Sequence, residues 1–213
     1  MAASRAVVLR WLGALGLLTA IAPVTPAKQP PVTFSSTCVC QNSHGKDRWA
    51  AKTDSSAVPK NNQEIQAVTP SEIYAWLGPK NPLTRSSPRI PQENKWYALT
   101  GRVIDLKVEA DGDIHIALQD ATGNRPGVVG VEVPTSRQWC AIRKRVFDWT
   151  TAKFPFRVIS SKTLKMNGLH VVTIIGKAFF DVDHAPKDHS NRRNNQPGYA
   201  AWEVHPVMQI VER

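Results

Sequence analysis

The chain has 213 residues, 42% of them hydrophobic and 8% aromatic, and its 27 lysines and arginines against 17 aspartates and glutamates give a formal charge of +10. This length predicts one globular domain, or one domain with an appendage, because ~100 to 200 residues form a typical domain. The apolar content excludes a wholly disordered chain, and no stretch reaches the ~18 apolar residues that a membrane-spanning helix needs. We therefore expect a small, basic protein with one hydrophobic core.

Residues 1–27 have the order of segments that is typical of a secretory signal peptide. Arg5 and Arg10 precede an apolar run over residues 11–24, and small residues follow up to Ala27. The run has the length of a signal-peptide core and is too short for a stable membrane anchor. We expect cleavage near Ala27 and a protein that is periplasmic or secreted.

The three cysteines fit export into an oxidising compartment. Cys38 and Cys40 are separated by one residue, and Cys140 lies far along the chain. The sequence therefore predicts a disulfide between Cys140 and either Cys38 or Cys40, with one thiol left over.

Residues 28–95 hold 8 of the 16 prolines and many Ser, Thr, Asn and Gln residues, which predicts an extended N-terminal arm. Within the arm, Thr69-Pro70-Ser71-Glu72 is a capping box with proline at the first helical position. It predicts a short helix that ends at Gly78-Pro79. So short a helix needs tertiary contacts, which we expect from Ile73, Trp76 and Leu77.

From Trp96 onward the pattern changes to that of strands. Apolar and polar residues alternate in several runs, and Asp111-Gly112 is a strong signal for a hairpin turn. Five strands are predicted, over residues 96–110, 114–119, 128–133, 170–181 and 202–211.

One amphipathic helix is predicted over residues 136–151, between the third and fourth strands. Its buried stripe should consist of Trp139, Ile142, Val146 and Trp149, with its arginines on the surface. The predicted order is three meandering strands, a helix and two more strands. This is the order of the five-stranded Greek-key barrel called the OB-fold. The first strand is long enough to pair on both sides, which favours this barrel for residues 96–213 over an α+β sandwich.

Several strings resemble the recurring motifs of a family of uncharacterised, often exported bacterial proteins. The motifs, with x for any residue, are DGDxHxxL from Asp111, GxxFFDxxH from Gly176 and ExHPV from Glu203. The resemblance covers scattered positions over residues 45–211, implies an OB-like fold and implies no particular activity. The strand order is also similar to that of staphylococcal nuclease, but the catalytic pattern of that enzyme has no residue-by-residue match here.

Alternation along the strands separates an apolar inner face from a polar outer face. The barrel interior should receive Ile114, Ile116, Leu118, Val129, Val131 and Val133. OB-fold pairing should gather the outer residues His115, Glu132, Glu203 and His205, near Asp113, Asp181, Asp183 and His184. Two histidines and a carboxylate can hold a divalent metal, and the candidate ligands are His115, Glu132 and His205. The alternative is a set of ordinary polar side chains on a solvated strand face.

Two other regions are candidates for binding an anion. The loop over residues 183–201 lies where OB-folds commonly contact ligands, and its candidates are His184, Arg192 and Arg193. The segment 136–167 has eight basic residues and one acidic residue, although a charged helix surface is most often simply solvated.

The favoured interpretation is an exported OB-like binding module for a polar or anionic ligand, such as a nucleic acid, a glycan or an envelope phosphate. Such a module needs no cofactor. The alternative is a secreted metal-dependent hydrolase or nuclease that uses the histidine and carboxylate cluster. A third interpretation is a structural protein of the cell envelope that docks through its arm.

Overall fold

The computed structural model describes residues 34–36, 38–40, 47–151 and 163–213, which belong to one compact unit. The predicted signal peptide, residues 1–27, lies outside these ranges. Within them, no helix combines the length and the apolar character that crossing a bilayer requires.

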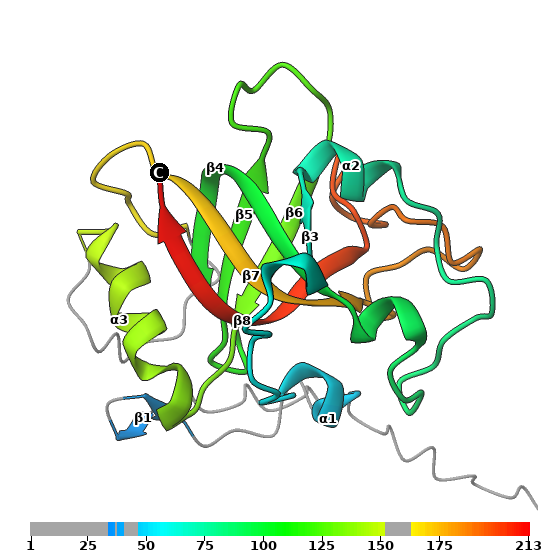
Figure 1. Cartoon of the computed structure of the whole chain (residues 1–213), viewed down its shortest axis with the longest axis horizontal. Coiled ribbons are helices and arrows are strands. Elements are labelled where there is room, and N and C mark those ends of the chain that lie inside the picture. The colour runs from blue at the N-terminus through cyan, green and yellow to red at the C-terminus, as the bar shows by residue number, and fades with distance from the viewer. Residues whose placement is uncertain (1–33, 37, 41–46, 152–162) are drawn as a thin grey trace, which may run out of the picture. The chain divides into compact units, whose positions relative to one another are not determined.

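Five strands close into the predicted barrel (Figure 1). They are β4 (Trp96–Val108), β5 (Ile114–Gln119), β6 (Val128–Val133), β7 (Val171–Phe180) and β8 (Trp202–Glu212). The 13-residue β4 makes closure possible because its first half pairs antiparallel with β7 and its second half with β5. The ring is completed by β8, which runs antiparallel to β7 and parallel to β6. The prediction of a closed barrel with one helix between its third and fourth strands is confirmed.

The barrel interior contains the apolar residues that the alternation predicts. Every one of the predicted interior side chains of β5 and β6 is fully buried. Leu99 and Leu106 of β4, Ile174 of β7 and Trp202 of β8 complete the same core. Burying each large aliphatic side chain contributes ~1.5 to 3 kcal/mol, so this inner face is the main source of stability.

The predicted helix consists of a 3-10 turn, η3 (Arg137–Trp139), followed by α3 (Cys140–Asp148). Trp139, Val146 and Trp149 are buried as predicted, whereas Ile142 is only partly buried. The prediction that the helix arginines are exposed is wrong for Arg143. Its guanidinium is buried and donates to the carbonyl oxygens of Val133 and Gly112, each at 2.9 Å. These carbonyls, at the end of β6 and in the β4–β5 turn, need a donor where the helix excludes water.

The short strands β1 (Phe34–Ser36) and β2 (Val39–Cys40) pair antiparallel in the N-terminal arm. Cys38, between them, forms a disulfide with Cys140 at the start of α3, with 5.2 Å between the Cα atoms. Of the two predicted pairings, the structure therefore contains Cys38 with Cys140, and this bond links the arm to the barrel domain.

The arm also adds a strand to the sheet, because β3 (Ile65–Val68) pairs parallel with the start of β4. The predicted capping box then opens α2 (Pro70–Ala75), with Thr69 N donating to Glu72 Oε2 at 2.7 Å. Ile73 is buried as expected. Leu77 was expected to dock but is 86% exposed. Its backbone docks instead, since Trp202 Nε1 donates to the Leu77 carbonyl at 2.8 Å.

A third part of the arm, with α1 (Trp49–Lys52) and η2 (Pro91–Asn94), packs on the barrel, whereas η1 (Asn62–Glu64) is exposed. Arg48 makes a buried two-pronged contact with Glu93, at 2.8 and 2.6 Å. Both residues also bond the main chain of Phe180, through its carbonyl oxygen and its N–H. Breaking a buried pair of this kind costs ~3 to 5 kcal/mol, so the arm is firmly attached at this point.

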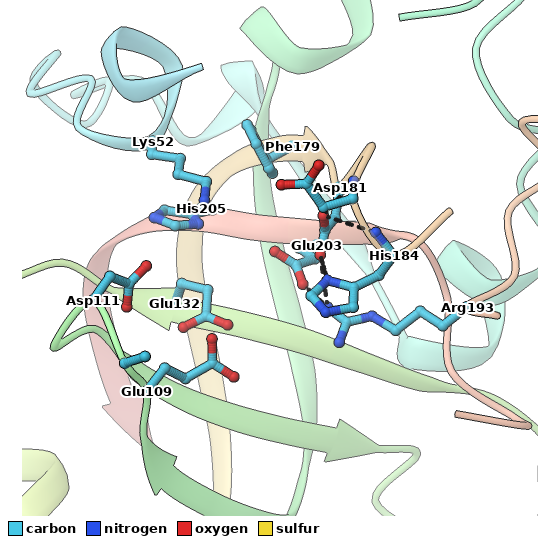
Figure 2. A pocket seen from close by; sticks show the side chains of 12 residues that line it. Lys52, Glu109, Asp111, Glu132, Phe179, Asp181, His184, Arg193, Glu203 and His205 are labelled. Atoms are coloured by element: carbon cyan, nitrogen blue, oxygen red, sulfur yellow. Dashed lines mark hydrogen bonds and ion pairs between the residues drawn. The ribbon is translucent and has the colours of Figure 1, made fainter. Parts of the chain in front are cut away.

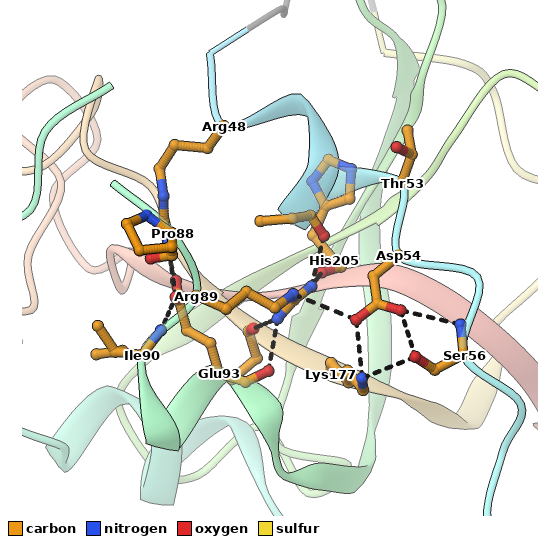
Figure 3. Close-up of polar contacts among 12 residues, drawn as sticks. Arg48, Thr53, Asp54, Ser56, Pro88, Arg89, Ile90, Glu93, Lys177 and His205 are labelled. Carbon is orange, nitrogen blue, oxygen red and sulfur yellow. Dashed lines mark hydrogen bonds and ion pairs between the residues drawn. The ribbon is translucent and has the colours of Figure 1, made fainter. Parts of the chain in front are cut away.

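Arg89 provides a second attachment between the arm and the barrel (Figure 3). It donates to the carbonyl oxygens of Ala51 in α1 and of His205 in β8, at 2.5 and 2.8 Å. One guanidinium thus fixes α1 against the outer face of β8. The consequence for function is that Lys52, the last residue of α1, lies over the polar residues of that face (Figure 2).

Candidate functional site

The outer face of the barrel brings together the polar residues that the sequence predicts. His115 of β5 lies directly opposite Glu132 of β6. The parallel pairing of β6 with β8 places Glu203 and His205 on the neighbouring strand. These four residues are only 1 to 5% exposed, so the alternative of a solvated strand face is wrong. The arm and the loops cover this face, which local alternation along a strand cannot reveal.

A pocket of about 180 Å³ opens on this face and is called the outer-face pocket below (Figure 2). It lies between α1, the β4–β5 turn, the last residues of β7, the first residues of β8 and the loop between these two strands. Its lining is mostly charged or polar and consists of Lys52, Glu109, Ala110, Asp111, Glu132, Phe179, Asp181, Asp183, His184, Arg193, Glu203 and His205.

Three residues beside the outer-face pocket lie close enough together that they could hold a metal ion. One ligand atom from each of Glu109, His115 and Glu132 lies within 4.8 Å of the others. His115 Nδ1 forms a hydrogen bond with Glu132 Oε1 at 2.5 Å and lies 3.8 Å from Glu109 Oε1. Two carboxylates and one imidazole form a donor set suited to Mn²⁺, Fe²⁺ or Zn²⁺.

His205, the third ligand that the sequence predicts, is not a member of this group. Its Nε2 lies 3.5 Å from Asp113 Oδ2. Glu109 takes its place, and sequence reasoning missed it. The signal was present, because Lys107 pairs with His115 and alternation puts Glu109, two residues later, on the same face.

Burial and like charge favour the neutral forms of two of these residues. Burial lowers the pKa of His115 to about 4, although the charge of Glu109 opposes this. Burial and the charges of Glu109, Asp111 and Asp113 raise the pKa of Glu132 well above its usual value. A cation in the pocket would reverse the second effect, because positive charge favours the ionised carboxylate.

Several buried polar atoms around the outer-face pocket have no hydrogen-bond partner among the described residues. They are Glu132 Oε2, Asp113 Oδ2, Arg193 Nε and both ring nitrogens of His205. A buried polar group without a partner costs ~1 to 3 kcal/mol, and native proteins contain few of them. These five atoms are half of the ten such atoms among the described residues, and a ligand, an ion or ordered water could complete their bonding.

Gly130 of β6 allows the side chains of the site to approach one another. A Cβ atom at this position would lie 2.9 Å from His115 Cε1, 3.2 Å from Glu203 Oε1 and 3.5 Å from a guanidinium nitrogen of Arg193. The absence of a side chain at Gly130 therefore leaves room for the imidazole and for the ion pair.

A chain of charged groups connects the inner part of the pocket to its rim. Buried Arg193 donates to Glu203 and lies 3.3 Å from Asp181 Oδ2. His184 Nδ1 contacts the same Asp181 oxygen at 2.5 Å, and the His184 side chain is half exposed. The hydrogen bond to Asp181 raises the pKa of His184. Burial raises the pKa of Asp181, but the bond from His184 and the charge of Arg193 outweigh it and lower that pKa.

Arg192 is the predicted site residue that the structure places elsewhere. Its guanidinium lies 3.7 Å above the ring of Tyr74 and donates to the Tyr74 carbonyl oxygen at 2.7 Å. It lines a separate pocket, together with His189. Part of the basic segment 136–167 lies outside the described residues, and Arg143 and Arg145 within it bond main-chain carbonyls.

The chain matches no protein-family model, no curated protein and no solved structure. An argument for function therefore depends on the chemistry of the outer-face pocket. The arrangement offers three ligands for a cation, a histidine and aspartate pair that could transfer a proton, and cationic groups that could hold an anion.

Proposed function

We propose that this protein is a binding module whose outer-face pocket holds a divalent cation together with a small polar ligand. Glu109, His115 and Glu132 are the proposed ligands of the cation. The observation that carries this proposal is the unpartnered Glu132 Oε2, which belongs to a side chain only 5% exposed and lies beside the other two ligands. A bound cation would give that oxygen a partner and would offset the repulsion among the surrounding carboxylates.

A calorimetric titration of the full chain with Mn²⁺ and with Zn²⁺ tests the proposal. We expect one high-affinity site per chain, and we expect Glu132→Gln and Glu109→Gln each to weaken binding by more than about tenfold, since even changes behind the ligands cost ~10- to 100-fold. Glu64→Gln is the matched control because Glu64 is an exposed carboxylate of η1. Equal affinity in the parent and both ligand variants, at unchanged melting temperature, would refute the site.

A metal-dependent hydrolase is a second candidate function, and the pair formed by Asp181 and His184 favours it. A half-exposed histidine oriented by a partly buried carboxylate is a suitable proton donor for a leaving group. A cation-bound water would be the nucleophile. Cleavage of a phosphate ester that requires both the cation and His184 would support this candidate. If the protein binds the cation and the ligand but does not cleave such an ester, the hydrolase function is wrong and only the binding function remains.

We further propose that the protein is exported, as the order of segments in residues 1–27 indicates. The bond between Cys38 and Cys140 is compatible with an oxidising compartment. N-terminal sequencing of the protein recovered from expressing bacteria should find a chain that starts near Lys28, outside the cytoplasm. Cytoplasmic protein that retains Met1 and Arg5 would contradict the proposal.

A further inference from the structure

We infer that the small ligand carries a phosphate group, bound in the outer-face pocket between the cation and the side chains of Lys52, His184 and Arg193. This inference rests on the proposed cation site and specifies the chemistry of the ligand that shares it. Its basis is that the unpartnered acceptors and the unpartnered donors of the pocket belong to different residues.

The unpartnered donors come from two separate segments of the chain. The ammonium group of Lys52, in α1, makes no hydrogen bond or ion pair with any described residue, and its Nζ lies 5.7 Å from the centre of the Phe179 ring. His184 bonds to Asp181 through Nδ1, and this bond raises the pKa of His184, which favours the imidazolium form; in that form Nε2–H is a second donor, without a partner in the described chain. Arg193 Nε is buried and has none. All three residues line the same pocket, so its walls contain three N–H donors that have no partner in the described chain.

The structure fixes the helix that carries Lys52 and orients the other two donors directly. Arg89 fixes α1, and with it Lys52, by its bond to the Ala51 carbonyl. Asp181 accepts from both His184 and Arg193. The donors are thus preorganised, which lowers the entropy cost of binding an anion.

A phosphate group fits these donors better than a planar carboxylate does. Its oxygens point in four directions and can accept from the α1 side, from the loop side and from a cation at the same time. A carboxylate has two oxygens in one plane and cannot serve all three sides. The acidic residues of the pocket repel an anion, so the phosphate requires the cation as its neighbour.

Calorimetric titration of inorganic phosphate into the full chain preloaded with Mn²⁺ tests this inference. Phosphate should bind when Mn²⁺ is present, and acetate should not displace it. Lys52→Met and His184→Gln should each weaken phosphate binding by about tenfold or more, the usual worth of a charge-assisted hydrogen bond. Neither variant should weaken Mn²⁺ binding. Lys60→Met is the matched control because Lys60 is exposed and does not line the pocket.

The outcomes separate this inference from the proposal on which it rests. If Mn²⁺ binds but phosphate does not, or if both variants bind phosphate as the parent does, the phosphate inference is wrong and the cation site stands. If acetate binds the Mn²⁺-loaded protein as tightly as phosphate does, the inferred preference for a tetrahedral anion is wrong. If Mn²⁺ itself fails to bind, both proposals fall.

Discussion

The inner and outer faces of the barrel are both shielded from water, but their side chains differ in kind. Inside, β5 and β6 contribute aliphatic residues such as Ile116 and Val131, which need nothing beyond close packing. Outside, the same two strands contribute His115 and Glu132, which are equally buried and ionisable. The chain that covers the outer face is the arm, with α1 fixed by Arg48 and Arg89.

This difference separates the part of the molecule that stabilises the fold from the part that costs stability. Burying an apolar side chain is favourable, whereas burying an unpaired polar group is unfavourable. A site that keeps Glu132 Oε2 and both His205 nitrogens without hydrogen bonds is retained at a cost in stability. Such concentrated cost is typical of functional sites. Changes on the inner face should therefore affect stability, and changes on the outer face should affect binding more.

The largest expected effect lies in the core. Trp149→Ala should lower the free energy of unfolding by ~3 to 5 kcal/mol, because it removes a buried aromatic side chain that also donates to Glu212 at 3.1 Å. Urea denaturation measures the change. Lys144→Ala is the control, since its contact with Asp148 is exposed and should contribute less than ~1 kcal/mol. Similar stability of the two variants would show that α3 does not form the core as described.

Arg143 tests whether a polar residue can matter as much as an apolar one in the same helix. Arg143→Met keeps the apolar stem but removes the donors to the Val133 and Gly112 carbonyls. We expect a loss of roughly 1 to 3 kcal/mol, which is the cost of leaving a buried acceptor unsatisfied. Thermal and urea denaturation measure it. A neutral result would mean that Arg143 behaves as the exposed arginine that the sequence predicted.

Gly130→Ala tests the outer face directly. The added methyl group would lie 2.9 Å from His115 Cε1, so it should displace the imidazole and weaken Mn²⁺ binding while costing ~1 to 3 kcal/mol of stability. Gly168→Ala is the matched control, because a Cβ there finds its nearest neighbour at 3.9 Å. Undiminished Mn²⁺ affinity in Gly130→Ala would show that the position of the imidazole is unimportant for the cation.

A smaller effect is expected from the pH dependence of His205. Burial and the charge of Lys52 lower the pKa of His205 to about 3, below the unfolded value of about 6.5. The folded state therefore binds fewer protons, and this contribution to stability is complete above pH ~6.5 and is lost as the pH falls toward 3. In urea denaturation, the change of pH from 7 to 5 should be less favourable to the parent than to His205→Gln, by an amount of order 1 kcal/mol.

Two neighbouring acids act in the opposite direction. Burial raises the pKa values of Asp111 and Asp113 to about 6, so their contribution is present at low pH and lost as the pH rises through 6. Both acids remain in the variant, so the difference between the two proteins isolates His205. A pH profile that is the same in parent and variant would contradict the shifted pKa.

The barrel could be predicted from the sequence because apolar and polar residues alternate along each strand. This alternation places Ile114 and Val133 inside the barrel. It also predicted that His115, Glu132, Glu203 and His205 would share one face, since pairing order follows from the fold class. It could not predict that this face is buried, because the cover comes from Arg48 and Arg89, which contact β7 and β8 from far away in the chain.

The predictions for Leu77 and Arg143 were wrong for similar reasons. Leu77 appeared to be part of an apolar helix face, but α2 ends at Ala75 and only the Leu77 backbone docks. Arg143 was predicted to be exposed because charged side chains usually lie on the surface. It is buried because it donates to carbonyl oxygens of other elements. Main-chain acceptors have no signature in a sequence, so a buried arginine that serves them cannot be recognised from residue type.

A crystal structure of the protein grown with Mn²⁺ and phosphate, with anomalous diffraction data that locate the manganese, would test the central claim most directly. The account predicts one anomalous peak bonded to Glu109, His115 and Glu132, with phosphate density between it and Lys52. An anomalous map without a peak at these three residues, in crystals whose outer-face pocket is open to solvent, would contradict the account.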